Sequence, residues 1–214
     1  KNVITWTTLI TGYAGCGLCH KAIHCFQDMQ RSGLQPDEVT LVCILKVCGK
    51  IGAIDRGQDI HAEIVREGLL RRSSISLGNA LVDRYEKCGY LSKAEELLYS
   101  FCKRDVISWN ALITGYAENG NSERVLECFN GMKLQCVLPD SLTYISVLKA
   151  CASIGAIAKG KQIHEEIMSR NLLMKDIELG NALIDMYAKC GMVAKAQGVL
   201  ECLRIRGVVS WSSL

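Results

Sequence analysis

The feature that most constrains this sequence is that it repeats itself about every 102 residues. The rarest residues show the period first: the two prolines, Pro36 and Pro139, lie 103 positions apart, and the three tryptophans recur at nearly the same interval. Longer stretches follow the same shift, since residues 78–81 (GNAL) recur as residues 180–183. A fixed period of this kind is the sequence signature of a repeat architecture, in which similar units stack on their neighbours.

Each long period contains three shorter units, and each unit has the pattern of two helices joined by a turn. In residues 106–117 the apolar side chains recur at the spacing of an amphipathic helix, which residues 119–121 (NGN) interrupt. A second apolar stripe follows and ends at Pro139. A unit this small cannot bury its apolar face alone, so we expect an all-α solenoid of stacked helix–turn–helix repeats. The predicted boundaries are 1–2 (the end of one unit), 3–37, 38–74, 75–105, 106–140, 141–176, 177–207 and 208–214 (the start of another).

Composition excludes several classes of protein. Hydrophobic residues make up 49% and charged residues 22% of the chain, which excludes a disordered or collagen-like protein. The net charge of +3 is too small to indicate a nucleic-acid partner by itself. No apolar run reaches the roughly 18 residues that a membrane span requires, so we expect no membrane partner. Because the first residue is Lys1 and not Met, we expect the segment to belong to a longer chain.

One stretch near the N-terminus matches the spacing of haem and zinc ligands. Residues 16–20 (CGLCH) fit the C-x-x-C-H haem-attachment pattern, and His24 adds another potential zinc ligand. The repeat alignment argues against both uses, because the corresponding residues 119–123 (NGNSE) are a variable turn between two helices. We therefore expect no cofactor and no metal.

Histidines, cysteines and tryptophans also recur in register with the repeat. His61 and His164 begin H-x-E sequences, half of the zinc deaminase signature, but no P-C-x-x-C follows either one, so packing is favoured. Free cysteine is a small, readily buried hydrophobe, and period-locked cysteines predict core positions in a reducing compartment. These cysteine pairs are Cys25 with Cys128, Cys48 with Cys151, and Cys88 with Cys190. The tryptophans expected to pack between helices are Trp6, Trp109 and Trp211.

Three kinds of stretch in the second period carry recognisable motifs. They are residues 106–120 (VISWNALITGYAENG), residues 148–156 with 160–164, and residues 180–191 (GNALIDMYAKCG). In that order, they resemble the P-, L- and S-type units of the pentatricopeptide repeat (PPR) family, in its plant PLS subclass. The order P-L-S runs twice through the chain. The resemblance implies a right-handed superhelical solenoid that binds single-stranded RNA in a mitochondrion or chloroplast. It implies an RNA editing or processing factor with other such factors as further partners, and any C-terminal deaminase domain would lie in a parent chain.

The resemblance also implies which residues read a base. In the family, the fifth residue of each first helix and the last residue of the unit face the RNA, about one base per repeat. The pairs are Thr7/Asp37 and Asn110/Asp140 in P-type units, Asn79/Asp105 and Asn181/Gly207 in S-type units, with Ser212 in the last partial unit. An Asn amide has the donor and acceptor that suit uracil. In the family, a pair of Thr and Asp is associated with guanine. The L-type pairs, Val42/Ser74 and Ile145/Asp176, have an apolar fifth residue and are expected to discriminate little. The predicted target is 5′-G-n-U-U-n-pyrimidine.

Two further sets of residues follow from the resemblance. The second residue of each P-type unit corresponds to the apolar wedge between bases, whereas the S-type equivalents are polar. These residues are Ile4, Ile107 and Val209, and Ser76 and Glu178, respectively. Lysines that close three first helices are phosphate-contact candidates, with a solvated surface as the alternative; they are Lys50, Lys87 and Lys189.

The base-reading candidates have structural alternatives too. Aspartate is a preferred helix N-cap, a role compatible with base reading, and Asp37, Asp105, Asp140 and Asp176 all precede predicted helices. The recurring asparagines could instead be structural amides between repeats.

The leading prediction is a sequence-specific RNA-binding segment without catalysis of its own. The alternative is a protein-interaction solenoid of tetratricopeptide type. Tetratricopeptide units keep a length near 34, whereas these run through 35, 37 and 31, then 35, 36 and 31. The alternation and the recurring polar pair both favour the RNA reader.

Overall fold

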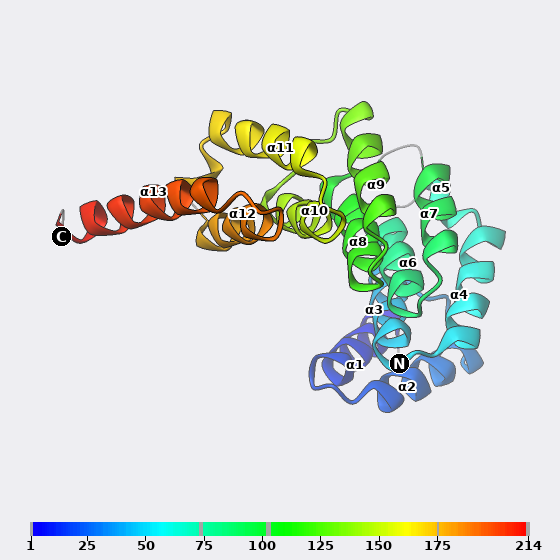
Figure 1. The fold of residues 1–214 in the computed structure, drawn as a ribbon. Coiled ribbons are helices and arrows are strands. Elements are labelled where there is room, and N and C mark those ends of the chain that lie inside the picture. The colour runs from blue at the N-terminus through cyan, green and yellow to red at the C-terminus, as the bar shows by residue number, and fades with distance from the viewer. Residues whose placement is uncertain (1, 73–74, 102–103, 175, 213–214) are drawn as a thin grey trace. The chain divides into compact units, whose positions relative to one another are not determined.

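The computed structural model describes residues 2–72, 75–101, 104–174 and 176–212, with side chains given for all of these except 71, 72, 174 and 204–212. Every regular element in the described residues is a helix (Figure 1). This confirms the all-α class and the stacked helix pairs expected from the repeat.

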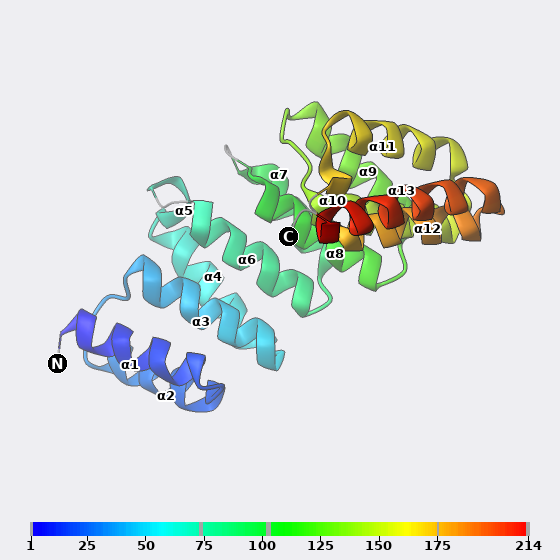
Figure 2. The same cartoon turned by 90° about the vertical axis from the view of Figure 1, so that its left-hand side faces the viewer.

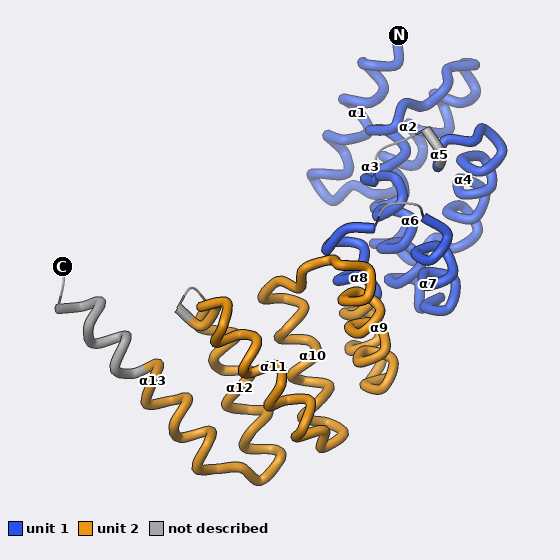
Figure 3. Tube along the Cα trace, turned by 90° about the horizontal axis from the view of Figure 1, so that it is seen from above, with its two compact units in different colours: residues 1–112 blue, residues 113–214 orange. Residues whose placement is uncertain are grey.

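Two compact units divide the chain, residues 1–112 and residues 113–214 (Figure 3). The first contains α1 (Val3–Gly15), α2 (Cys19–Arg31), α3 (Glu38–Ile51), α4 (Ile54–Arg66), α5 (Leu69–Arg72), α6 (Ile75–Lys87) and α7 (Leu91–Ser100). Helix α8 (Val106–Glu118) carries the division between the units. The second contains α9 (Ser122–Leu134), α10 (Ser141–Ile154), α11 (Ile157–Ser169), the 3₁₀ turn η1 (Leu172–Met174), α12 (Ile177–Lys189) and α13 (Val193–Ser212).

Within each unit the first helices of successive repeats pack side by side. In the N-terminal unit α1 packs on α3 and α3 on α6, and each of these also packs on its own second helix, α2, α4 or α7 (Figure 2). In the C-terminal unit α10 packs on α12, with α11 and α13 as their second helices. The first helices therefore form one layer of each unit and the second helices the other.

The starts of four first helices are set by aspartate, as the sequence predicts. Asp37 accepts a hydrogen bond from the Thr40 backbone N–H at 2.8 Å, and Asp140 accepts one from the Thr143 N–H at 2.9 Å. Asp105 and Asp176 cap α8 and α12 in the same way. The ends of α3 and α10 are set by Gly52 and Gly155, whose positive φ angles of 65° and 67° suit glycine.

The core lies between the layers and between neighbouring repeats. Two glycines on the second helices allow a neighbouring first helix to approach closely: a Cβ on Gly57 would lie 2.7 Å from the Arg84 side chain, and one on Gly160 would lie 2.6 Å from the Met186 sulfur. The predicted burial of tryptophan is confirmed for Trp6 and Trp109, which are 7% and 0% exposed.

Two features differ from or exceed the sequence prediction. The short helices α5 and η1 follow the second helix of both L-type units and were not foreseen. Helix α13 continues past residue 207, where the sequence places a junction between units. The side chains of Gly207, Val209, Trp211 and Ser212 lie outside the described residues, so the roles predicted for them stay predictions. Ser74 also lies outside the described residues, so the role predicted for it stays a prediction.

Candidate functional site

The clearest polar cluster joins the end of the first S-type unit to the start of the next. The Asn79 Nδ2 on α6 donates to both carboxylate oxygens of Asp105 at 3.1 Å. The Ser108 hydroxyl on α8 lies 2.7 Å from Asp105 Oδ1 and also within hydrogen-bond distance of the Asn79 Oδ1, so its single hydrogen is shared between these two acceptors. Asp105 thus caps α8 and, together with Ser108, fixes the plane of the Asn79 amide. The predicted pairing of the fifth residue with the last residue is present here.

A related cluster lies at the end of the first P-type unit. The Thr40 hydroxyl donates to Asp37 Oδ1 at 2.6 Å and lies 2.7 Å from the Thr7 hydroxyl on α1. The direct distances from Thr7 Oγ1 to the two Asp37 oxygens are longer, 3.4 and 3.5 Å. Thr7 is therefore linked to Asp37 mainly through Thr40, and this predicted pair is also brought together.

The other predicted pairs are only partly described. Asn110 belongs to the N-terminal unit and Asp140 to the C-terminal unit, so their pairing stays a prediction. Asp140 and Thr143 form a capping box at the start of α10, which repeats the relation of Asp37 to Thr40. Asn181 is exposed on α12, and its predicted partner Gly207 lies outside the described side chains.

The hydroxyl residues of these clusters were missed by the sequence reasoning, although a signal was present. The third residue of each unit is a threonine or serine wherever the preceding unit ends in an aspartate that is predicted to read a base: Thr40, Ser108 and Thr143. After an L-type unit, whose fifth residue is apolar, the third residue is a leucine, namely Leu77 or Leu179. The hydroxyl thus recurs only at junctions where a polar fifth residue precedes it.

Electrostatics hold Asp105 in its charged form. Burial would raise the pKa of this carboxyl, but hydrogen bonds from the Ser108 side chain and backbone and from Asn79 outweigh it, and the pKa lies below the ordinary 3.8. A charged Asp105 accepts from the Asn79 amide, so the amide NH₂ points to the carboxylate. One N–H and one carbonyl lone pair of Asn79 remain for a ligand.

A pocket of about 680 Å³ surrounds Asn79 in the N-terminal unit. Its walls include Ser76, the second residue of the same unit, and Ile107, the second residue of the next unit. Ile107 is 62% exposed, so much of its aliphatic side chain is accessible to a ligand. The predicted wedge and the predicted base-reading amide therefore line one cavity. The remaining lining residues are Lys46, Lys50, Ala80, Asp83, Lys87 and Ala111.

A second pocket, of about 480 Å³, surrounds Val42 at the fifth position of the first L-type unit. It is lined by Val39 from the second position of that unit and by Ser76 from the next, with Thr11, Glu38, Cys43 and Lys46 completing the wall. Its fifth residue has no polar atom on its side chain, so nothing at that position can form a hydrogen bond to a base edge. The weak discrimination expected of this unit stays a prediction.

Exposed side chains recur at the second position throughout the first helices. Ile4 is 72% exposed, and Val39 and Leu142 of the L-type units are 59% and 51% exposed. Ser76 and Glu178 of the S-type units are exposed as well. The second residue of each of these repeats therefore faces solvent, in the N-terminal and in the C-terminal compact unit, so it is accessible to a ligand.

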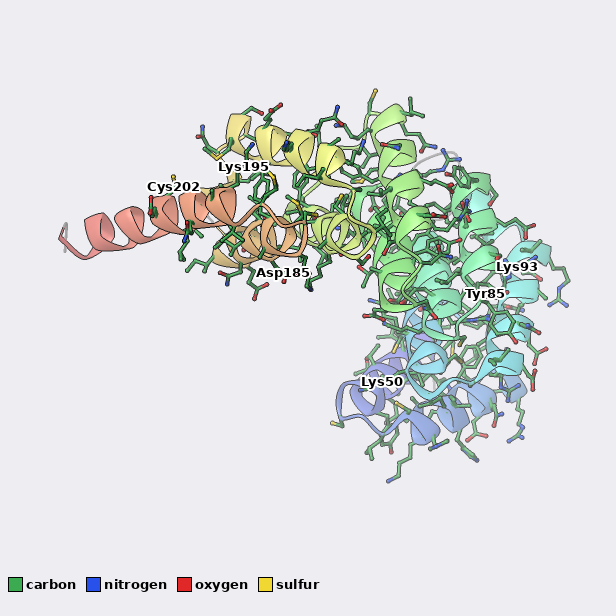
Figure 4. All side chains as sticks on the ribbon, viewed as in Figure 1. Lys50, Tyr85, Lys93, Asp185, Lys195 and Cys202 are labelled. Atoms are coloured by element: carbon green, nitrogen blue, oxygen red, sulfur yellow. The ribbon has the colours of Figure 1, made fainter. Side chains whose placement is uncertain are left out.

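The three lysines singled out in the sequence are exposed, and two of them line the same pocket. Lys50 and Lys87 both border the Asn79 pocket. Lys87 Nζ lies 2.8 Å from Asp83, and Lys189 Nζ lies 2.9 Å from Asp185. Figure 4 marks Lys50 on α3 and Asp185 on α12.

The residues that resemble a deaminase half-site serve packing. His61 Nδ1 lies 2.9 Å from the Tyr85 hydroxyl, and His164 Nδ1 lies 2.9 Å from the Tyr187 hydroxyl. Burial lowers the pKa of both imidazoles, and the charge of Arg84 adds to this effect at His61. The same contact in both periods joins a second helix to the next first helix.

The two cysteines of the motif near the N-terminus differ in exposure: Cys16 is exposed and Cys19 is buried. In the described part of the chain no three His, Cys, Asp or Glu side chains lie close enough together to hold a metal ion. Cys48 and Cys151 are buried free thiols, as predicted, and burial raises the pKa of each to about 11. No described helix combines the length and apolar character needed to cross a bilayer.

The fold and the recurring polar pairs define a helical-repeat protein whose first helices present one set of side chains per repeat. Comparison with known proteins identifies the type of repeat. Residues 1–50 and 104–153 match the PPR repeat family, and residues 79–106 and 181–208 match the PPR repeat. The chain belongs to the pentatricopeptide repeat family, and this assignment replaces the tetratricopeptide alternative.

Relatives in Arabidopsis thaliana align along the whole chain. A chloroplastic pentatricopeptide repeat-containing protein is 36% identical over 214 residues, all of this chain and 34% of the relative. A mitochondrial one is 35% identical, again over the whole chain but only 20% of the relative. The chain thus spans about a third or less of the length of these relatives.

Solved structures of the family share the fold. PPR10 in complex with an 18-nt psaJ RNA element has a TM-score of 0.54 and 22% identity, covering 96% of this chain and 35% of that one. The PPR domain of Arabidopsis thaliana protein-only RNase P 1, in complex with tRNA, has a TM-score of 0.66 and 14% identity, covering 88% of this chain and 95% of that one.

Proposed function

We propose that this chain binds single-stranded RNA in a sequence-specific manner, with about one base per repeat and no catalysis of its own. The observation that carries the proposal is the Asn79 pocket, in which an oriented amide lies between the second residues of two successive units. Single-stranded RNA is read by hydrogen bonds to splayed bases and by contacts to their faces, and helical repeats can present two or three side chains to each base.

The chemistry of the pocket favours uracil at Asn79. The amide keeps one N–H donor and one carbonyl acceptor for a ligand, which complement the carbonyl and the N3–H on the Watson–Crick edge of uracil. Ile107 supplies an apolar face for the ring. At the first unit the Thr7 hydroxyl takes the place of the amide, and guanine is the expected base.

Known relatives support the wider role. PPR10 and the protein-only RNase P domain were solved with RNA, and the Arabidopsis relatives are named chloroplastic or mitochondrial. The unit lengths of 35, 37 and 31 support the PLS subclass. We infer that the chain is the recognition segment of an organellar RNA editing or processing factor.

The test is a reciprocal exchange of the fifth residues. Asn79→Thr recreates the Thr/Asp pair of the first unit and should move the preference at the third nucleotide from uracil to guanine. Thr7→Asn should move the first nucleotide from guanine toward uracil. The preferred base should bind about fivefold more tightly than the alternative, the scale of one or two net hydrogen bonds. The measurement is selection from a randomised RNA pool, followed by fluorescence anisotropy on single sequences.

Two further variants control the exchange. Val42→Ile keeps an apolar fifth residue and should leave every preference unchanged, whereas Asn110→Thr should shift only the fourth nucleotide from uracil toward guanine. Wild-type protein without any base preference, or an Asn79→Thr variant with the wild-type preference, would refute the assignment.

A further inference from the structure

Lys46 lines both the Asn79 pocket and the Val42 pocket described above. It is exposed on α3, one turn after Val42 and one turn before Lys50. Residues four apart lie on one face of a helix, so these three side chains form a single stripe.

The neighbouring stripe on α6 has a different charge balance. It carries Asn79, Asp83 and Lys87, and Asp83 lies 2.8 Å from Lys87 and offsets its charge. Among the described residues Lys46 has no carboxylate within ion-pair distance. Glu38 also lines the Val42 pocket, but it is eight residues from Lys46, about 12 Å along α3.

The same distribution of charge recurs in the second period. Lys149 stands at the ninth position of the second L-type unit and is exposed on α10. The second S-type unit again pairs its lysine, since Asp185 lies 2.9 Å from Lys189. The ninth position of the P-type units is threonine, at Thr11 and Thr114. Among the exposed lysines of the described first helices, those without a carboxylate partner thus lie on the L-type units, whose fifth residue is apolar.

We propose that Lys46 and Lys149 bind the phosphodiester that joins the nucleotide on each L-type unit to the next nucleotide. The proposal rests on the proposed function. A residue that lines two adjacent base pockets lies where the linkage between the two nucleotides must pass, and an ammonium without a carboxylate partner favours an anion there. The L-type units hold the strand by charge and keep the register between the bases read by the P- and S-type units.

The experiment moves one neutral linkage along the RNA. A methylphosphonate replaces one phosphodiester at a time in a nine-nucleotide RNA that contains the predicted target, and anisotropy gives the Kd for each. Lys46→Gln should weaken binding about three- to tenfold at 0.1 M salt, equally for any base at the second nucleotide. It should lower the salt slope by about 0.7, the value for one phosphate of a single strand.

The sharpest readout is the combination of variant and linkage. In the Lys46→Gln variant, the methylphosphonate should no longer raise the Kd at one linkage, the one that Lys46 contacts. In the Lys149→Gln variant, the same loss of effect should occur at the linkage three nucleotides further toward the 3′ end. Lys93→Gln, which removes the same charge from α7, is the matched control and should leave the pattern of wild type.

Several results would overturn the assignment. If the Kd increases caused by Lys46→Gln and by the methylphosphonate multiply at every linkage, the two changes act independently and Lys46 does not contact a phosphate. A loss that depends on the second base shows that Lys46 reads a base instead. Failure of the proposed function looks different, because the wild-type chain would then bind none of the RNAs.

Discussion

Arg84 is a buried side chain whose charge its surroundings do not balance. It is 0% exposed, and its three guanidinium nitrogens have no hydrogen-bond partner among the described residues. It lies against Gly57 and over the ring of Tyr85 at 3.8 Å. The corresponding residue of the second S-type unit is Met186, which packs on Gly160 in the same way. An unpaired ion in the core costs several kcal/mol, only part of which a cation–π contact returns.

Arg84→Met should therefore stabilise the N-terminal unit. We expect the free energy of unfolding to rise by about 2 kcal/mol, because an apolar side chain of similar length removes the desolvation of the guanidinium. Denaturant unfolding followed by circular dichroism measures the change. The reverse substitution, Met186→Arg, is the matched control and should destabilise the protein. An Arg84→Met variant with an unchanged or lower unfolding free energy would show that the guanidinium is satisfied in the folded state.

At the scale of residues, the sequence predicted two members of the polar cluster, Asn79 and Asp105, but not the third, Ser108. Asn79 and Asp105 were assigned from the family pattern, and the structure brings them together. Ser108, which hydrogen-bonds to both, was not predicted because the family pattern concerns the fifth and last residues of a unit and Ser108 is a third residue. Its contacts cross a unit junction, and only a comparison of third residues along the repeat could have indicated them. Lys46 was not predicted either, because its place in the walls of two neighbouring pockets is visible only in the folded chain.

At the scale of elements, two helix ends are held by residues other than glycine in a left-handed conformation. Cys136 after α9 and Asn171 after α11 have φ angles of 56° and 52°. The corresponding residues of the first period are Gly33 and Gly68, with φ of 72° and 64°. Asparagine tolerates this conformation, whereas a cysteine Cβ is crowded by the backbone.

Cys136→Gly should relieve that strain. We expect a gain of about 0.5–1 kcal/mol in the free energy of unfolding, since the release of strain outweighs the greater freedom of glycine in the unfolded chain. Thermal and denaturant unfolding both report the change. Cys136→Ala removes the thiol but keeps the Cβ and should show no gain. If alanine stabilises as much as glycine, the thiol and not the backbone is responsible.

The elements themselves were largely predictable, and the exceptions have physical reasons. Apolar periodicity and aspartate caps indicated the starts of α3, α8, α10 and α12 correctly. The helices α5 and η1 were not predicted because three or four residues give no periodicity to detect. Both short helices lie in the two longest units, of 37 and 36 residues.

At the scale of the whole chain, the repeat period determined the architecture because each unit packs on its immediate neighbours. The small net charge of +3 conceals an uneven distribution: on the described first helices, the lysines without a carboxylate partner recur on the L-type units. Composition could not reveal this, since pairing depends on which side chains share a helix face. A second feature is also common to both units: a half-buried histidine hydrogen-bonded to a tyrosine hydroxyl.

These two histidines should make the stability of the chain depend on pH below about 6.5. Burial lowers the pKa of His61 and His164 below the ordinary 6.5, so the unfolded chain binds more protons than the folded chain in this range. Their stabilising contribution is complete above pH 6.5 and is lost as the pH falls toward the folded-state pKa. Asp105 and Glu166 do not contribute here, because their pKa values are held below 3.8 and 4.5, respectively.

The measurement is the free energy of unfolding at several pH values. The double variant His61→Gln, His164→Gln should be less stable at pH 7.5 but lose less stability than wild type between pH 6.5 and 5. The double variant Tyr85→Phe, Tyr187→Phe removes the hydroxyl partner and keeps both imidazoles, so it should keep a slope of the wild-type sign. A wild-type slope that survives the loss of both histidines would assign the pH dependence to other groups. Because one histidine lies in each unit, single variants should each remove part of the slope, which tests whether the repeat uses the same contact twice.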